Sequence, residues 1–170
     1  MNNTLLFCGL LFKEIDYRNR AISELVDIYG EISAYSKTIN FNEFSDYYNK
    51  EFGHDIFREW ILFSEKIDLE HLYEKKIITC SIEKKFKRDN NRLVNIDPGI
   101  ITLSNLQLLT TKNFAHRIYL GEGIFCELTL FFTKSGVRYL EWTYPDYKTE
   151  EAAEFFIESR KKLKNHKQSS

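Results

Sequence analysis

The sequence has little of what marks several common classes of protein. Its 170 residues include only two prolines and seven glycines, and 24 Lys and Arg against 25 Asp and Glu give a formal net charge of −1. So little proline and glycine excludes a collagen-like or low-complexity disordered chain. A charge so close to zero disfavours a histone-like coat on nucleic acid. No uncharged apolar stretch approaches the roughly 20 residues that cross a bilayer, so we expect no membrane partner.

Cysteine is scarce as well. Cys8, Cys80 and Cys126 are odd in number, widely spaced and without a CxxC motif, which disfavours a disulfide framework and a zinc knuckle. The apolar run 5–12 follows no basic segment and precedes no small-residue cleavage site, unlike a signal peptide. We therefore expect free thiols in a protein of the reducing cytoplasm.

The sequence is rich in hydrophobic residues (43%) and aromatic residues (15%), which suffices for one core. We expect a single α+β domain over residues 1–164 and a frayed polar tail at 165–170. Apolar patterning predicts strands at 5–12, 32–39 and 59–64, and helices at 20–29, at 69–88 and from Thr149 onward. This order favours a mostly antiparallel sheet, compatible with a ferredoxin-like βαββαβ half that a three-stranded meander extends.

The meander is predicted over residues 114–144. Gly121-Glu122-Gly123 and Ser135-Gly136 supply the glycines that tight hairpin turns need. A loop at 121–123 places Arg117 opposite Glu127, and a two-residue turn at 135–136 places Glu127 opposite Tyr144. One face then carries apolar residues, namely Ile118, Leu120, Ile124, Cys126, Leu128, Leu130 and Phe132. The other face carries Arg117, Tyr119, Glu127, Thr129, Trp142 and Tyr144.

This polar and aromatic face has two interpretations. It is a cross-strand ion pair on a half-covered sheet, or it is a pocket floor where Arg117 binds a phosphate or carboxylate and Glu127 orients the arginine. Lys112, just before the meander, is a second cation for such an anion. The rings that would surround the ligand belong to Tyr119, Trp142, Tyr144 and Tyr147. A register slip of one residue would separate these groups.

Residues 92–99 hold a second polar group. Asp97-Pro98-Gly99 is typical of a turn, in which Asp97 accepts backbone N–H groups. The alternative places Asn95 and Asp97 at the end of a strand, facing a cleft as ligand-binding or catalytic side chains.

His116 is the candidate general acid or base, because an imidazole titrates near neutrality. Asp97 or Asp146 would orient it, or the three side chains would together hold a divalent metal. The competing prediction places His116 opposite Leu128 on the apolar face, as a structural residue. No glycine-rich phosphate loop is present, so the sequence identifies no cofactor.

Several sequence blocks resemble the uncharacterised prokaryotic family catalogued as domain of unknown function 4416. The blocks are Cys8–Phe12, Asp46–Tyr48, Arg92–Gly99, Thr110–Gly121, Gly123-Ile124, the ELTL run from Glu127, and Trp142–Tyr147. The chain departs from the family at Ile100-Ile101, where Tyr-Leu is frequent, and at Cys126, where a small residue is frequent. The resemblance implies a small cytoplasmic α+β protein and carries over no catalytic residue.

Three functions compete. The first is a small-ligand-binding protein or enzyme for an anionic substrate, phosphorylated or nucleotide-like. The second is an assembly module or homo-oligomer that uses the aromatic segment 41–57. The third is an RNA-associated module, in which exposed rings stack on bases and the basic segments 84–92 and 160–167 meet phosphates on one shared face.

Overall fold

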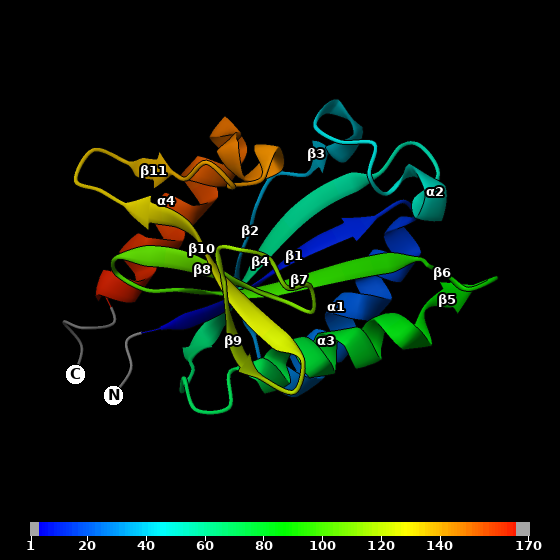
Figure 1. Cartoon of the computed structure of the whole chain (residues 1–170), viewed down its shortest axis with the longest axis horizontal. Coiled ribbons are helices and arrows are strands. Elements are labelled where there is room, and N and C mark those ends of the chain that lie inside the picture. The colour runs from blue at the N-terminus through cyan, green and yellow to red at the C-terminus, as the bar shows by residue number, and fades with distance from the viewer. Residues whose placement is uncertain (1–3, 166–170) are drawn as a thin grey trace.

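The computed structural model describes residues 4–165, which form a nine-stranded antiparallel sheet with helices on both faces (Figure 1). Its strands are β1 (Leu5–Phe12), β2 (Ile32–Tyr35), β3 (Ile39–Asn40), β4 (Phe57–Lys66), β7 (Val94–Ile101), β8 (Asn105–Thr110), β9 (Arg117–Gly121), β10 (Ile124–Phe132) and β11 (Val137–Tyr139). A separate hairpin joins β5 (Lys87–Arg88) to β6 (Asn91–Arg92). The helices are α1 (Ile15–Tyr29), α2 (Asn49–Phe52), α3 (Tyr73–Lys85) and α4 (Glu150–Asn165), with 3₁₀ turns η1 (Phe41–Glu43) and η2 (Pro145–Lys148).

The strand order confirms the α+β prediction. Strands β7, β1, β4 and β2 are neighbours in that order, with α1 between β1 and β2 and α3 between β4 and β7 along the chain. This is the split βαβ arrangement of a ferredoxin-like half. Strands β8, β10 and β11 continue the sheet beyond β7, while β9 pairs with β10 and β3 pairs with β4.

Each face of the sheet buries a different core. Leu6, Cys8 and Leu10 of β1 pack under α1 and α3, whereas Leu5 and Phe7 pack under α4. Both faces of β1 are therefore covered, which explains why a strand so continuously apolar is stable there. Within residues 4–165, no helix combines the length and the apolar character that a membrane crossing requires.

Several predicted boundaries move. Helix α1 begins at Ile15 rather than 20. The prediction missed its first turn because that turn is mostly exposed and shows no apolar period. Helix α3 is shorter than the predicted 69–88. The predicted strand 32–39 breaks into β2 and β3, where the Ser36 hydroxyl accepts the Trp60 backbone N–H at 2.9 Å in place of a ladder bond. Helix α4 includes Asn165, and residues 166–170 of the predicted tail lie outside the described residues.

Asp97-Pro98-Gly99 is not a turn but the middle of β7, so the turn prediction is wrong. Pro98 lies opposite Cys8 of β1, while β7 pairs with β8 only from Gly99 onward. Proline is tolerated where no strand partner needs its missing N–H. Gly99 is required for close approach, because a Cβ there would lie 2.5 Å from both the Phe7 ring and the Gln107 carbonyl oxygen.

The predicted meander is correct in its first hairpin and wrong in its second. Arg117 pairs with Glu127, but a four-residue connection joins Phe132 to Val137, so Tyr144 is not a strand partner of Glu127. A bulge at Thr129 also interrupts the alternation of β10. Ile124 and Cys126 consequently pack in the cluster that contains Leu72, whereas Leu130 and Phe132 pack under α4. Ile118, predicted to be in the core, is exposed.

The crowding at Gly99 gives a stability prediction. We expect Gly99→Ala to lower the free energy of unfolding by about 1–3 kcal/mol, since its methyl group would displace the Phe7 ring or separate β7 from β8. Urea denaturation of the purified variant measures the effect. Ser135→Ala, in the exposed β10–β11 turn, is the control that should stay within about 0.5 kcal/mol of wild type. An equally stable Gly99→Ala protein would contradict this account.

Candidate functional site

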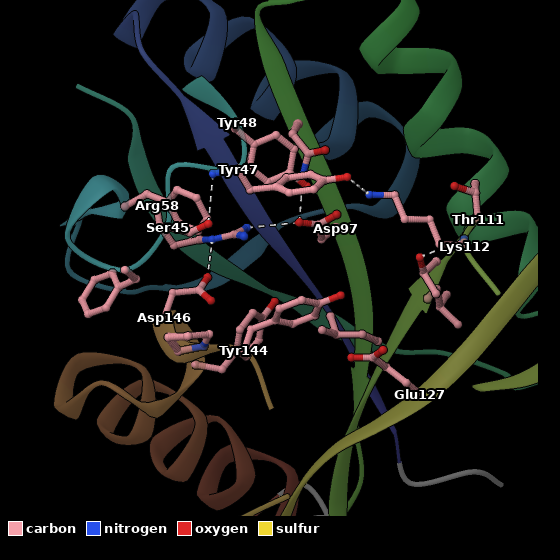
Figure 2. A pocket seen from close by; sticks show the side chains of 18 of the residues that line it. Ser45, Tyr47, Tyr48, Arg58, Asp97, Thr111, Lys112, Glu127, Tyr144 and Asp146 are labelled. Atoms are coloured by element: carbon pink, nitrogen blue, oxygen red, sulfur yellow. Dashed lines mark hydrogen bonds and ion pairs between the residues drawn. The ribbon is translucent and has the colours of Figure 1, made fainter. Parts of the chain in front are cut away.

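A cavity of about 450 Å³ opens on the face of the sheet that α4 covers only in part. Three of the chain's outer segments approach one another here: the segment around η1 and α2, the end of β8 with the residues after it (Thr110–Lys112), and η2 (Figure 2). The lining residues are Phe41, Phe44, Ser45, Tyr47, Tyr48, Arg58, Lys76, Arg92, Asn95, Asp97, Leu108, Leu109, Thr110, Thr111, Lys112, Glu127, Tyr144, Pro145, Asp146 and Tyr147. Its volume is that of a small-molecule site.

The cavity exists because the part of β7 that precedes Gly99 does not pair with β8. The backbone of Ile96, left without a strand partner on that side, is satisfied by α3 instead. The Lys76 ammonium donates to the Ile96 carbonyl at 2.9 Å, and the Ile96 N–H donates to the Glu83 carboxylate at 2.6 Å. A buried peptide group that lost its ladder bonds would otherwise be costly. Two side chains of α3 therefore hold the sheet open.

Arg58 is the centre of the charges at the cavity. This buried β4 side chain donates from Nε to Asp146 at 2.9 Å and from Nη1 to Asp97 at 3.3 Å. It passes over Gly9, where a Cβ would lie 2.9 Å from Arg58 Nη1 and 3.1 Å from the Tyr147 hydroxyl. The absence of a side chain at Gly9 thus leaves room for the guanidinium on the sheet surface.

A second arginine fixes the β7 side chains. Arg92 forms a bidentate pair with Glu51 of α2, at 2.7 and 2.9 Å, and donates from Nη1 to Glu83 and to the Asn95 amide oxygen. The Asn95 amide in turn donates to Asp97 at 2.8 Å. Bidentate and charge-assisted bonds of this kind define geometry well. Asp97 is therefore held in one orientation by groups from three elements.

The two carboxylates around Arg58 differ in their proton affinity. Burial alone would raise the pKa of Asp97, but the charges of Lys76 and Arg58 and the bond from Asn95 bring it below its ordinary value. Burial raises the pKa of Asp146, and Arg58 offsets this only in part. The Asp97 side chain is 25% exposed, against 3% for Asp146. Asp97 is thus an ionised acceptor of hydrogen bonds facing the cavity, and a weak base for proton abstraction.

Tyrosine rings form the walls. Figure 2 shows Tyr47 and Tyr48 on one side of Asp97 and Tyr144 on the other. Tyr48 packs against Phe41 and Phe52 at ring-centroid distances of 5.8 and 6.0 Å, which anchors the segment 41–52 to the sheet. The rings of this aromatic segment therefore serve mainly as one wall of the cavity, while Tyr47 remains 67% exposed at its mouth.

Lys112 differs from the other cations of the cavity. Arg58, Lys76 and Arg92 each have a carboxylate within 4.0 Å. Among the lining residues that the structure describes, only Lys112 lacks such a partner, and its ammonium donates to the Tyr47 hydroxyl at 2.8 Å. That hydrogen bond lowers the pKa of Tyr47. A neutral phenol is a weaker partner than an anion, so Lys112 can receive a negative group from a ligand.

Glu127, from β10, is buried at the opposite end of the cavity from Arg58 (Figure 2). Its Oε2 accepts from Arg117 Nε at 2.7 Å and lies 3.1 Å from His116 Nε2. Its Oε1 is buried and has no hydrogen-bond partner in the described residues. A carboxylate oxygen without a donor is an unusual feature of a folded protein.

The structure gathers many of the sequence-predicted site residues around this cavity. Those that line it are Asn95, Asp97, Lys112, Glu127, Tyr144, Asp146 and Tyr147. The others, His116, Arg117, Tyr119 and Trp142, lie outside the lining. Arg117 contacts Glu127, the Lys112 carbonyl and the Tyr144 hydroxyl with three of its nitrogens, so it positions lining residues.

His116 is also placed differently from either prediction. Its ring stacks on Trp142, with centroids 4.6 Å apart, and its polar contact is Glu127 rather than Asp97 or Asp146. Trp142 Nε1 donates to the Leu128 carbonyl beside the bulge, which fixes the stack. In residues 4–165, His, Cys, Asp and Glu side chains form no group of three suited to a metal ion, so the predicted metal set is not assembled.

The remaining predicted surface features lie apart. Tyr119 is exposed on β9, and its ring contacts Phe125. The basic segment 84–92, at β5 and β6, and the basic end of α4 lie at opposite ends of the molecule in Figure 1. The described parts of these two segments therefore do not build one shared positive face.

Sequence reasoning missed Arg58, Lys76 and Arg92, and did not connect Tyr47 and Tyr48 with this site. A signal existed for two of them. Arg58 shares a strand face with Trp60 and Leu62, and Lys76 falls on the buried side of its helix, so both are charges at core positions. A charge at such a position is rare without a partner. Arg92 and the tyrosines are marked only as members of the blocks Arg92–Gly99 and Asp46–Tyr48, which carry the family resemblance and assign them no role.

Removing the central cation should be costly. We expect Arg58→Met to lower the free energy of unfolding by about 3–5 kcal/mol, because Asp146 would stay buried without its cation. Chemical denaturation measures it, with Arg138→Met on exposed β11 as the control. Adding Asp146→Asn should recover part of the loss. A double variant as unstable as the sum of the single changes would contradict this pairing.

The lowered pKa of Asp97 predicts how its contribution to stability changes with pH. Its pKa is lowered in the folded state, so the ionised group adds stability above its ordinary pKa of 3.8 and that stability is lost as the pH falls further. We expect Asp97→Asn to be about 2 kcal/mol less stable than wild type at neutral pH. Denaturation between neutral and strongly acidic pH should show the difference shrinking. A difference that grows toward acid would refute the assignment.

Comparison with known proteins identifies the family of the chain. No curated protein and no solved structure matches the chain. The family model described as domain of unknown function (DUF4416) matches residues 2–163, which include every residue that lines the cavity. The chain therefore belongs to the DUF4416 family.

Proposed function

We propose that the protein binds a small anionic ligand of the phosphorylated or nucleotide-like kind in this cavity. The observation that carries the proposal is Lys112, the lining cation without a carboxylate partner among the described residues, at the mouth of a cavity with tyrosine walls. An ammonium whose partner is a neutral phenol can exchange that partner for a phosphate or carboxylate.

The other cations support this division of roles. Arg58, Lys76 and Arg92 are already bonded to carboxylates or to the β7 backbone, so an anion that replaced those bonds would leave buried acids unpaired. The ligand's negative group therefore belongs at Lys112. The rest of the ligand would extend inward between the tyrosine rings, which suit a flat ring or a base.

We further propose that the protein works in a reducing compartment such as the cytoplasm. Cys8, Cys80 and Cys126 are all free. Burial raises the pKa of the Cys126 thiol to about 11, and burial also raises those of Cys8 and Cys80. Such thiols are poor nucleophiles, which favours a structural role for the cysteines over a catalytic one.

The proposal predicts ligand binding that depends on Lys112. Phenyl phosphate, uridine 5′-monophosphate and adenosine 5′-monophosphate are suitable probes for titration calorimetry, and native mass spectrometry of fresh protein would detect a retained ligand. We expect Lys112→Ala to weaken binding of the phosphorylated probes by about tenfold or more, the loss of one charge-assisted hydrogen bond. Lys134→Ala, in the exposed β10–β11 turn, should bind as wild type does.

Two results would oppose the proposal. Wild-type protein that binds none of the phosphorylated probes and carries no extra mass would remove it. Binding that Lys112→Ala leaves unchanged would place the anion elsewhere.

A further inference from the structure

We propose that Glu127 is a specificity residue whose free oxygen, Oε1, accepts a hydrogen bond from an N–H or O–H group of the ligand. This inference rests on the proposed function, and it adds a chemical requirement at the end of the ligand away from the anion. The ligand would then carry a negative group for Lys112, a ring between the tyrosines and a neutral donor for Glu127.

The geometry leaves Glu127 with one oxygen to spare. Glu127 is 2% exposed and lines the cavity, and its Oε2 is occupied by Arg117 and His116. Oε1 is buried and has no donor among the described residues. A buried acceptor left unpaired is costly, so a donor supplied from the cavity would be favoured strongly over an acceptor in the same place.

The neighbours of Glu127 fix which oxygen stays free. Arg117 donates from Nε to Glu127, from Nη1 to the Lys112 carbonyl and from Nη2 to the Tyr144 hydroxyl. Its guanidinium is planar and rigid, so these three bonds prevent it from turning to the other oxygen. The same arginine thus orients the carboxylate and ties it to Lys112 and Tyr144, which belong to the cavity wall.

This arrangement makes the effect of Glu127→Gln directional. Arg117 Nε can only donate, so the new amide must present its oxygen to Arg117 and its NH₂ group to the cavity. The side chain keeps its shape, but the cavity gains a donor where it had an acceptor. A site that preferred ligand donors should then prefer ligand acceptors.

Matched aryl phosphates test this reversal. The 3- and 4-aminophenyl phosphates offer an N–H donor, and the 3- and 4-nitrophenyl phosphates of similar shape offer only acceptors. At mildly alkaline pH, where the amine is neutral, we expect wild type to bind the better amino isomer about tenfold more tightly than its nitro counterpart. Glu127→Gln should reverse that order. Glu65→Gln, at the exposed end of β4, should keep the wild-type order.

The outcomes separate the two proposals. Phosphate probes that bind through Lys112 but show the same order in wild type and Glu127→Gln would overturn the role of Glu127 and leave the proposed function standing. A wild-type preference for the nitro compounds would overturn that role even if Glu127→Gln failed to fold. Absence of binding by every phosphorylated probe would overturn the proposed function, and this inference with it.

Discussion

The peptide group of Ile96 is the point on which the site depends. This group has no strand partner on the β8 side, and Lys76 and Glu83 of α3 bind its carbonyl and its N–H instead. Pro98, two residues later on the same side of the strand, has no N–H group and therefore needs no acceptor there. Because β8 is not needed to satisfy this stretch, the two strands can part. The opening lets Asn95 and Asp97 meet groups from the helix, the outer segments and the opposite wall.

Arg58 then joins the early and late parts of the chain. It belongs to the ferredoxin-like half, whereas Asp146 lies in the 3₁₀ turn before α4, 88 residues later. Burying the Arg58 guanidinium removes its hydration, and this cost in free energy is offset only when both carboxylates bind it. The ion pair therefore specifies how η2 and α4 dock on the sheet more than it adds net stability.

Periodicity predicted the strands and helices that bury apolar residues, because burial itself creates the pattern. It located β1 to the residue, and the α+β class with a mostly antiparallel sheet is confirmed, whereas the strand order came from the structure. It failed at Asp97-Pro98-Gly99, which has the composition of a turn but lies within β7. Pro98 is tolerated there because that edge of β7 is unpaired, and Gly99 is needed because Phe7 lies so close. It also failed at Thr129, since a bulge shifts every later side chain of β10 to the other face. The ion pairs of Arg58 and Arg92 join residues far apart in sequence, and no local pattern encodes such pairs.

The lining residues of the cavity are spread widely along the sequence, and this affects when the cavity can form during synthesis of the chain. These residues run from Phe41, in η1, to Tyr147, in η2, so the cavity is complete only after most of the domain has left the ribosome. Domains acquire their contacts as the chain emerges, N-terminal parts first. While η2 is still inside the exit tunnel, Asp146 cannot pair with Arg58, and the sheet face around Gly9 remains exposed to solvent. A nascent chain can therefore have its ferredoxin-like half in place while the cavity is still incomplete, and the proposed ligand would bind only to chains whose synthesis has passed η2.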